Sequence, residues 1–313
     1  MRSRLVRTYA LPPELNPFIW SGVVLKLLVA FGESPYHKWH MAREGILDGI
    51  RRGFIDPDTT IVEASSGNTA HAMAVLCNAL GLKFVPVIPN DIPSPKLDLI
   101  RSIGGGVSPL MFSSKTETTV ERARHLGKQD RWYNPDQYMG EWNARAHEKF
   151  LAPEIFGQTP QFSLIFAPAG TFGTCLGIHQ YAQEKGKDVR VVPVLCAEDQ
   201  EVPAVRTLSR VKRDVRTGWE NVFDEKDLVF ADRHESFLES FRAWKHLPVQ
   251  IGPSSGLALA GAMKFLQRGM EAGTLDSFKK DDGKVHVGVL CPDGYGSYAD
   301  IYLRELSQSE LSR

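Results

Sequence analysis

Three turns rich in hydroxyl groups and glycine stand in this chain where an apolar segment gives way to a helix-like pattern. The first turn, in "EASSGNTAHAMAV", contains Ser65, Ser66, Gly67, Asn68 and Thr69. Serine and asparagine cap the first amides of a helix, and the remaining amides together with the helix dipole can bind an anion. An ordinary helix cap uses the same residue types, so this turn alone leaves both interpretations open.

The second turn, in "SLIFAPAGTFGTCLGIHQY", contains Gly170, Thr171, Phe172, Gly173 and Thr174. Glycines let the backbone approach a ligand and threonines add hydroxyl donors, a combination that suits a phosphate group. A dinucleotide site, as in NAD-dependent oxidoreductases, is the alternative, because Glu198 ends the next apolar run at the spacing of a ribose-binding acid. The glycines run G-x-x-G-x-x-x-G in the middle of the chain, which favours a monophosphate over the dinucleotide fingerprint.

The third turn, in "QIGPSSGLALAGAMKFL", places Ser254 and Ser255 before a helix of small residues. A monophosphate site beside hydroxyl-rich turns suits pyridoxal phosphate, which also needs a lysine for its Schiff base. Lys38, in "AFGESPYHKWHMAREGILDGI", stands between a strand-like run and an amphipathic helix. A lysine at a helix start is usually only solvated, but the order strand, lysine, helix, strand and hydroxyl-rich turn favours a catalytic role.

Strand-like and helix-like runs alternate along the whole chain, which predicts parallel α/β sheets covered by helices on both faces. The turn residues and aromatics of "RWYNPDQYMGEWN" interrupt this alternation and predict a boundary between two lobes with a cleft between them. Ligands in such sheets bind at the carboxyl ends of the strands. The expected strands are 23–30, 60–65, 83–89, 106–111, 163–169, 189–197, 228–232 and 285–292, and the expected helices include 42–53, 69–81, 118–129 and 175–185.

Composition excludes several classes of function. The 313 residues are 42% hydrophobic, and 37 basic residues balance 37 acidic ones, so no overall charge favours nucleic acid or a membrane surface. No apolar run approaches the roughly 20 residues of a membrane span, and the arginine-rich start predicts a structural arm and not a transit peptide. The spacing of the four cysteines and of His37, His40, His71 and His147 predicts reduced thiols in the cytoplasm and no metal site.

Taken in order, Lys38, Ser65 to Thr69, Gly170 to Thr174 and Gly252 to Gly256 resemble the motifs of the cysteine synthase-like, fold-type II pyridoxal-phosphate enzymes. The resemblance covers nearly the whole chain. It implies a two-domain fold of the tryptophan synthase β type, in which each domain is a mostly parallel sheet flanked by helices. The smaller, mobile domain would span 33–147 and carry the substrate loop, and the larger would span 1–32 plus 148–313 and carry the phosphate loop.

The resemblance also implies a lyase or transferase of amino-acid metabolism, expected as a homodimer. An O-activated serine or similar amino acid would lose its β-substituent to give an aminoacrylate, which a small nucleophile such as sulfide, a thiol or an amine would attack. Lys38 would bind the cofactor and act as general base, Asn68 would bind its phenolic oxygen, and Ser254 would face its pyridine nitrogen. The phosphate would lie on Gly170, Thr171, Phe172, Gly173 and Thr174, and the substrate carboxylate on Ser65, Ser66, Gly67, Thr69 and Gln137, although Gln137 could equally cap a turn.

Several departures from the family pattern leave the substrate open. "YHKWH" surrounds the lysine with unusual neighbours, Phe172 replaces a glycine, and "RTLSRVKRDVRTGWENVFDEKDL" replaces a glycine-rich substrate loop. A cofactor-binding homologue without turnover, acting as a sensor or partner subunit, is therefore the alternative function. The basic residues of the replaced loop either select an anionic β-substituent or form a solvated helix face or subunit contact. They are Arg206, Arg210, Lys212, Arg213 and Arg216.

Overall fold

The computed structural model describes residues 6–30, 37–90, 92, 94–159, 161–294, 298 and 306. The chain divides into two compact units, Met1–Gly32 with His147–Arg313 and Glu33–Ala146. We call them the large and the small unit. The sequence-based division placed His147 in the small domain, whereas its backbone belongs to the large unit. The roles expected for the two domains, including mobility of the smaller one, stay predictions.

The large unit is built on a six-stranded sheet in the order β1-β2-β10-β7-β8-β9. All neighbouring strands are parallel except β1, which pairs antiparallel with β2 at the edge. β1 lies in the segment expected to be an arm, because four residues, of which two are exposed and two half-buried, give too little apolar pattern to predict a strand. The strands are β1 (Arg7–Ala10), β2 (Val23–Val29), β7 (Leu164–Pro168), β8 (Arg190–Cys196), β9 (Val229–Ala231) and β10 (Val285–Cys291).

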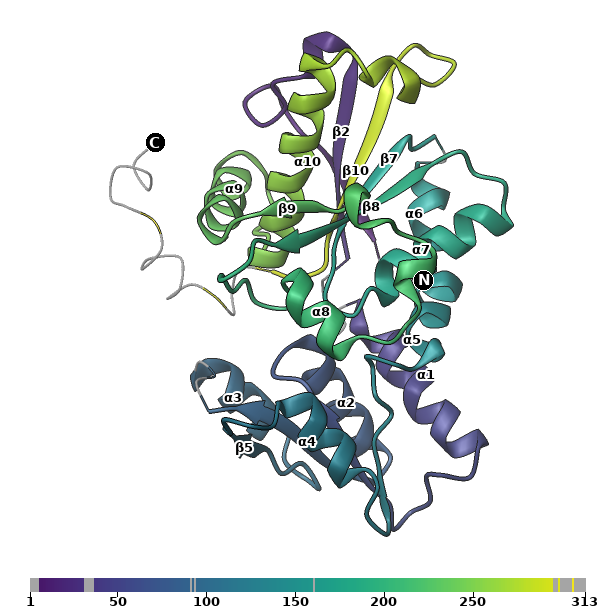
Figure 1. Ribbon diagram of the computed structural model, residues 1–313, viewed down its shortest axis with the longest axis vertical. Helices are drawn as coiled ribbons and strands as arrows, with labels where there is room; N and C mark the ends of the chain where they lie inside the picture. Colours follow the sequence, from purple (N-terminus) through teal and green to yellow (C-terminus); the bar gives the residue numbers. More distant parts are fainter. Residues whose placement is uncertain are drawn as a thin grey trace. The chain divides into compact units, whose positions relative to one another are not determined.

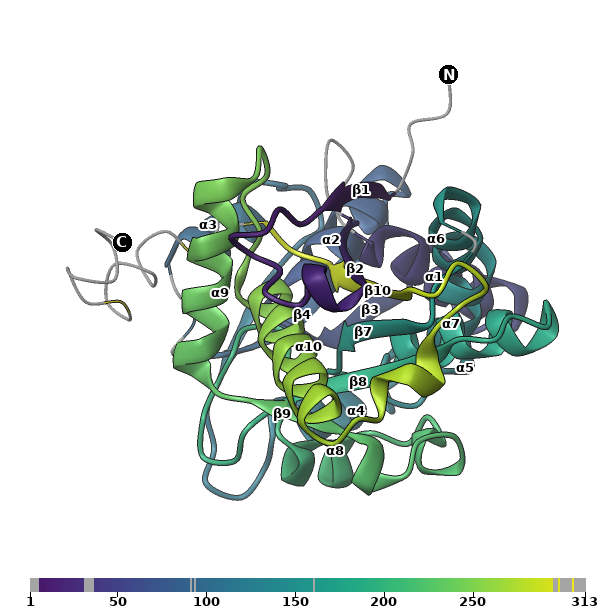
Figure 2. The ribbon, with the colours of Figure 1, turned by 90° about the horizontal axis from the view of Figure 1, so that it is seen from above.

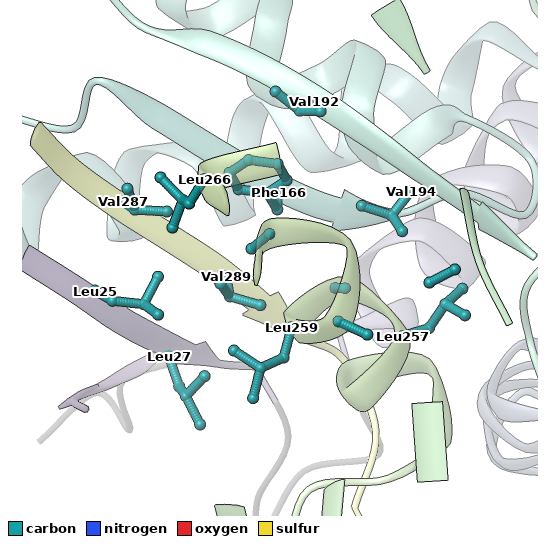
Figure 3. Close-up of a cluster of buried hydrophobic side chains, with 14 of the residues drawn as sticks. Leu25, Leu27, Phe166, Val192, Val194, Leu257, Leu259, Leu266, Val287 and Val289 are labelled. Atoms are coloured by element: carbon teal, nitrogen blue, oxygen red, sulfur yellow. The ribbon is translucent and has the colours of Figure 1, made fainter. Parts of the chain in front are cut away.

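Helices cover both faces of the large sheet, with α9 and α10 on one side and α6 and α7 on the other (Figures 1 and 2). The side chains of α10 interdigitate with alternate residues of β2, β7, β8 and β10 to form the main hydrophobic core (Figure 3). Alternation along parallel strands places the intervening side chains on the opposite face. The helical segments are η1 (Ile19–Ser21), η2 (His147–Leu151), α6 (Ala152–Gln158), α7 (Gly173–Glu184), α8 (Leu208–Asp214), η3 (Trp219–Asn221), η4 (Glu225–Asp227), α9 (Arg233–His246), α10 (Pro253–Glu271) and η5 (Leu275–Phe278).

The small unit is built on a four-stranded parallel sheet in the order β5-β4-β3-β6. Ile61 and Phe84 of this sheet pack with α1, α2 and α5 around a second core. Four consecutive residues of β3 are buried, as expected for a strand covered on both faces. The strands are β3 (Thr60–Ala64), β4 (Lys83–Pro89), β5 (Leu110–Phe112) and β6 (Trp132–Tyr133), and the helices are α1 (Lys38–Arg51), α2 (Asn68–Ala79), α3 (Ser94–Arg101), α4 (Thr119–Leu126) and α5 (Glu141–Ala146).

All four cysteines are buried and free of disulfides. Burial raises the pKa of Cys77 to about 12 and also raises the pKa values of Cys196 and Cys291. In the described ranges no helix has the length and apolar character to cross a bilayer. No group of three or more His, Cys, Asp or Glu side chains that could hold a metal ion is found among the same residues.

Candidate active site

Lys38 is the first residue of α1 and follows the carboxyl end of β2 after residues 31–36, which lie outside the described residues. Gly32, Ser34, Pro35 and Tyr36 of the lysine motif therefore carry no structural account. The side chain of Lys38 is half-buried. The positive end of a helix dipole disfavours a second positive charge, and a lysine has to be neutral to act as a nucleophile.

The first hydroxyl-rich turn connects β3 to α2, as the sequence predicted. Ser65 Oγ accepts hydrogen bonds from the amides of Gly67 and Ala70, at 3.3 and 3.2 Å, and so caps the helix from within the turn. Gly67 is the N-cap residue, and a Cβ built on it would meet no described atom within 4 Å. Open space in front of the first amides of a helix leaves room for an anion.

Gln137 lies against this turn although 68 residues separate it from Thr69. The Thr69 hydroxyl donates to Gln137 Oε1 at 2.9 Å, and Gln137 Nε2 donates to the Ala64 carbonyl at 3.0 Å. The structure thus brings together two residues predicted to bind the same carboxylate. Because the only hydroxyl proton of Thr69 is bound to Gln137, the side-chain donor that remains on this pair is the second hydrogen of Gln137 Nε2, beside the backbone amide of Thr69.

Glu63, the last residue but one of β3, is a site residue that the sequence analysis missed. Its side chain is fully buried and accepts from the amides of Ala64 at 2.9 Å and Gln137 at 3.0 Å. Burial, reinforced by the nearby Asp136 carboxylate, raises the pKa of Glu63 to about 8. Arg124 pairs with Asp136 at 2.7 Å. An acid within the otherwise apolar run "TIVEA" is the signal that could have found it.

The second turn, Gly170 to Thr174, which was predicted to bind a phosphate, connects β7 to α7. Phe172 is the N-cap residue, in a left-handed conformation (φ 62°, ψ −8°), and Gly173 begins the helix. A Cβ on Gly170 would lie 2.7 Å from the Ala204 carbonyl oxygen, so only glycine fits there. Thr174 Oγ1 lies 3.2 Å from Nε2 of the buried His147. The two threonines and the first amides of α7 form a set of donors at one helix N-terminus.

Ser254 stands in the first turn of α10, behind the N-cap residue Gly252. Its side chain is 1% exposed, and Oγ forms no hydrogen bond of acceptable geometry with a described residue, although it lies near enough to the Asp293 carboxyl to offset part of the rise that burial causes in the pKa of that group. The buried Asp293 carboxylate instead accepts from the amides of Ser254 and Ser255, at 3.2 and 3.0 Å. A buried hydroxyl without a partner is costly unless a ligand completes it, and a serine hydroxyl can donate to a pyridine nitrogen. The donor set therefore fits pyridoxal phosphate.

Two other sequence-based hypotheses are weakened by local pairing. The Glu198 carboxylate accepts from Ser209 N at 2.9 Å and Ser209 Oγ at 2.6 Å, so the ribose-binding role of the dinucleotide alternative has no support. In the basic cluster, Arg210 pairs with Glu201, Lys212 with Glu225, and both Arg206 and Arg213 with the buried Asp214. Four of the five basic residues are thus paired with nearby acids, and the role of the cluster stays a prediction.

The match to a known family decides between the cofactors. Residues 37–275 match the family model described as "Pyridoxal-phosphate dependent enzyme". The chain belongs to this family of pyridoxal-phosphate dependent enzymes. The prediction of the cofactor, the two-domain α/β fold and the family is thereby confirmed, and the dinucleotide alternative is not favoured.

Relatives of this pyridoxal-phosphate dependent enzyme include cysteine synthases. Cysteine synthase 1 of Emericella nidulans is 32% identical over 143 residues, which cover 44% of this chain and only 39% of that protein. Cysteine synthase B of Salmonella typhimurium is 25% identical over 93% of this chain and 89% of its own length. A crystal structure of a mutant of O-ureido-L-serine synthase with O-ureido-L-serine bound superimposes with a TM-score of 0.79 at 20% identity, covering 98% of this chain and 95% of that one. The last likeness concerns the fold alone.

Proposed function

We propose that this enzyme catalyses replacement of the β-substituent of an O-activated serine, or of a similar amino acid, by a small nucleophile. The buried hydroxyl of Ser254, which no described residue satisfies, is the observation that carries the proposal. The cofactor supplies an electron sink for the carbanion at the substrate α-carbon. The protein has to bind the substrate, move one proton and keep the cofactor in place.

The large unit would bind the cofactor. Gly170, Thr171, Gly173 and Thr174 would direct amides and hydroxyls at its phosphate, and Phe172 would contribute its amide. Ser254 Oγ would donate to the pyridine nitrogen. A neutral hydroxyl does not hold that nitrogen protonated as a carboxylate would, which favours loss of a β-substituent over reactions that need more charge delocalisation. The Asp293 carboxylate would not contact the pyridine nitrogen in place of Ser254, because its oxygens accept hydrogen bonds from the amides of Ser254 and Ser255.

The small unit would bind the substrate and move the proton. Lys38 Nζ would hold the cofactor covalently, and its amine would take the proton from the α-carbon of the substrate. Asn68 would donate to the phenolic oxygen of the cofactor. The substrate carboxylate would lie at the N-terminus of α2, on Ser65, Ser66, Gly67 and Thr69, with the remaining amide hydrogen of Gln137 directed at it.

Mass spectrometry after borohydride reduction tests the lysine assignment. We expect a phosphopyridoxyl group on the peptide that contains Lys38, and its loss in Lys38→Ala. The exposed Lys83 gives a matched control, because Lys83→Ala should keep the modification. A modified lysine elsewhere in the parent protein would remove Lys38 from the mechanism.

Release of the leaving group tests turnover against the alternative of an inert binding protein. We expect acetate or phosphate to appear when the holoenzyme is mixed with O-acetylserine or O-phosphoserine and sulfide, and none with Lys38→Ala. Release from neither substrate, nor from other O-substituted serines, would favour the sensor or partner-subunit hypothesis. The identity of the nucleophile follows from a panel of sulfide, thiols and amines.

The four cysteines are buried and form no disulfide, which supports a reducing compartment, and we propose the cytoplasm. We also propose a homodimer, as expected from the family resemblance. Light scattering of the purified holoenzyme measures the mass directly, and a monomer of 34.9 kDa would contradict the dimer.

A further inference from the structure

Phe172 occupies a backbone conformation that its residue type rarely adopts. Its φ of 62° is in the left-handed region, which glycine adopts without steric strain and which bulky residues rarely adopt. The residue replaces a glycine of the resembled phosphate-loop motif, and its side chain is 1% exposed. Other contacts therefore have to stabilise this turn, because the left-handed backbone conformation is unfavourable for Phe172 itself.

An aromatic cluster provides these contacts. The rings of Phe172 and Trp219 stack with centroids 4.6 Å apart and planes inclined by 26°, and Phe223 lies 6.0 Å from Phe172. Trp219 is fully buried, and its indole N–H has no hydrogen-bond partner in the described part of the chain. Ring packing, and not hydrogen bonding, is therefore what Trp219 contributes.

The segment that carries Trp219 holds the same turn through its backbone. We call residues 204–223, between β8 and β9, the brace segment. The amide of Arg206 donates to the Ala169 carbonyl at 3.2 Å, and Thr217 Oγ1 donates to the Thr171 carbonyl at 3.4 Å. This segment stands where the family pattern has a glycine-rich loop, so the unusual loop and the unusual Phe172 meet at one place.

Ion pairs of the basic cluster connect two parts of the brace segment. Asp214, 2% exposed, pairs with both Arg206 and Arg213. Although burial alone would raise the pKa of Asp214, the two guanidiniums hold it below its usual range. The carboxylate is therefore charged at neutral pH and ties the start of the segment to the end of α8.

We propose that Phe172 and Trp219 are positioning residues that hold the 169–174 turn in the shape that binds the cofactor phosphate. The inference rests on the proposed function, in which this turn binds that phosphate. A turn that is already ordered loses less freedom on binding, which strengthens binding without any new contact to the ligand. A glycine at position 172 would leave the backbone of the turn more conformational freedom. Phe172, stacked on Trp219, restricts that freedom.

Equilibrium dialysis of the apoprotein against pyridoxal phosphate and against pyridoxal tests the proposal without measuring turnover. The measured quantity is the Kd for pyridoxal divided by the Kd for pyridoxal phosphate. Pyridoxal lacks the phosphate, and its cyclisation to a hemiacetal in solution affects parent and variants alike, so the change of this ratio between parent and variant reports the turn. We expect Phe172→Ala, Phe172→Gly and Trp219→Ala to lower this ratio by roughly 5- to 30-fold, the factor that corresponds to ordering one backbone residue. Trp219→Phe keeps an aromatic ring and should stay within about 2-fold of the parent.

Phe156→Ala is the matched control. Phe156 is another buried phenylalanine of the large unit, stacked on Tyr181 near the far end of α7, with centroids 5.6 Å apart. It should lower the melting temperature but leave the Kd ratio unchanged. Because glycine relieves the left-handed backbone at 172, Phe172→Gly should be at least as stable as Phe172→Ala, and circular dichroism identifies the folded variants to be compared.

The outcomes are distinct. A parent ratio above one that falls in the Phe172 and Trp219 variants supports the proposal, and an unchanged ratio in Phe172→Gly and Trp219→Ala overturns it while the phosphate site stands. A fall of the same size in Phe156→Ala would overturn it too, because the effect would then be general. If the parent binds both ligands equally, the turn does not bind phosphate, and both the site assignment and this inference are wrong.

Discussion

Ionisation of Glu63 should make the stability of this enzyme fall as pH rises through the neutral range. The carboxyl is fully buried and its pKa is raised to about 8, chiefly by burial and then by Asp136. In the unfolded chain the pKa of a glutamate is about 4.3. A pKa that is higher in the folded state means that stability is fully present below pH 4.3 and is lost progressively up to pH 8.

The expected size follows from these two pKa values. Between pH 5.5 and 7.5 the folded carboxyl is mostly protonated and the unfolded one mostly ionised, so unfolding releases a proton. Integrating this difference gives a loss of about 2 to 3 kcal/mol in the free energy of unfolding over those two pH units. The charged groups near Glu63, Asp136 and Arg124, form their own ion pair at 2.7 Å.

Glu63→Gln isolates the effect, because glutamine keeps the shape and cannot ionise. At pH 5.5 the variant should be less stable by about 1 to 3 kcal/mol, since its Nε2 faces one of the two amides that the carboxyl oxygens accept from. At pH 7.5 the difference should shrink by about 2 to 3 kcal/mol, because only the parent loses stability. Urea unfolding of apoprotein at four pH values measures the difference directly.

The exposed Glu141 gives the control, because Glu141→Gln in the same unit should leave the pH dependence of the parent unchanged. A difference between the parent and Glu63→Gln that stays constant within about 0.3 kcal/mol from pH 5.5 to 8.5 would refute the reasoning. Since Glu63 holds the amide of Gln137, the variant should also raise KM for the amino acid more than it lowers kcat.

Three further outcomes are expected. Ser254→Ala should change the free energy of unfolding by less than about 0.5 kcal/mol, because the hydroxyl lacks a described partner, but should weaken cofactor binding measured by dialysis. Gly170→Ala should destabilise the holoenzyme by about 1 to 3 kcal/mol in thermal unfolding, because its Cβ would lie 2.7 Å from the Ala204 carbonyl oxygen, and an unchanged melting temperature would contradict that packing. Arg210→Ala should keep the parent's ratio of kcat/KM for O-phosphoserine and O-acetylserine, because Arg210 pairs with Glu201; a fall in that ratio would restore the anion-selecting hypothesis.

The elements of this fold were predictable where local pattern is strong. The run 83–89 forms β4 without adjustment, and 60–65 and 285–292 form β3 and β10 within a residue of their expected ends. The expected strand at 106–111 is shifted to Leu110–Phe112, and β6, two residues long, was not expected. Short strands at the edge of a sheet receive their pattern from pairing with a neighbour and not from their own residues.

The site was predictable at its turns but not in its supporting contacts. Capping residues and glycines indicate a strand-turn-helix connection from local sequence alone, so the turns after β3 and β7 could be predicted. The contact of Gln137 with Thr69 and Glu63 joins positions more than 65 residues apart, and sequence spacing does not predict it. The pairing of Arg213 with Asp214 was not expected either, because neighbouring positions on a helix generally point to different sides.

The four buried cysteines allow local unfolding of the enzyme to be measured by their reaction with a thiol reagent. Alkylating reagents attack the thiolate, and the raised pKa values of Cys77 and Cys291 leave almost none of it in the folded chain near neutral pH. Cys77 is in the small unit, whereas Cys175, Cys196 and Cys291 are in the large one. A brief pulse of iodoacetamide followed by peptide mass mapping would therefore record which unit opens first, and how tightly that opening is suppressed when cofactor is bound, without any introduced label.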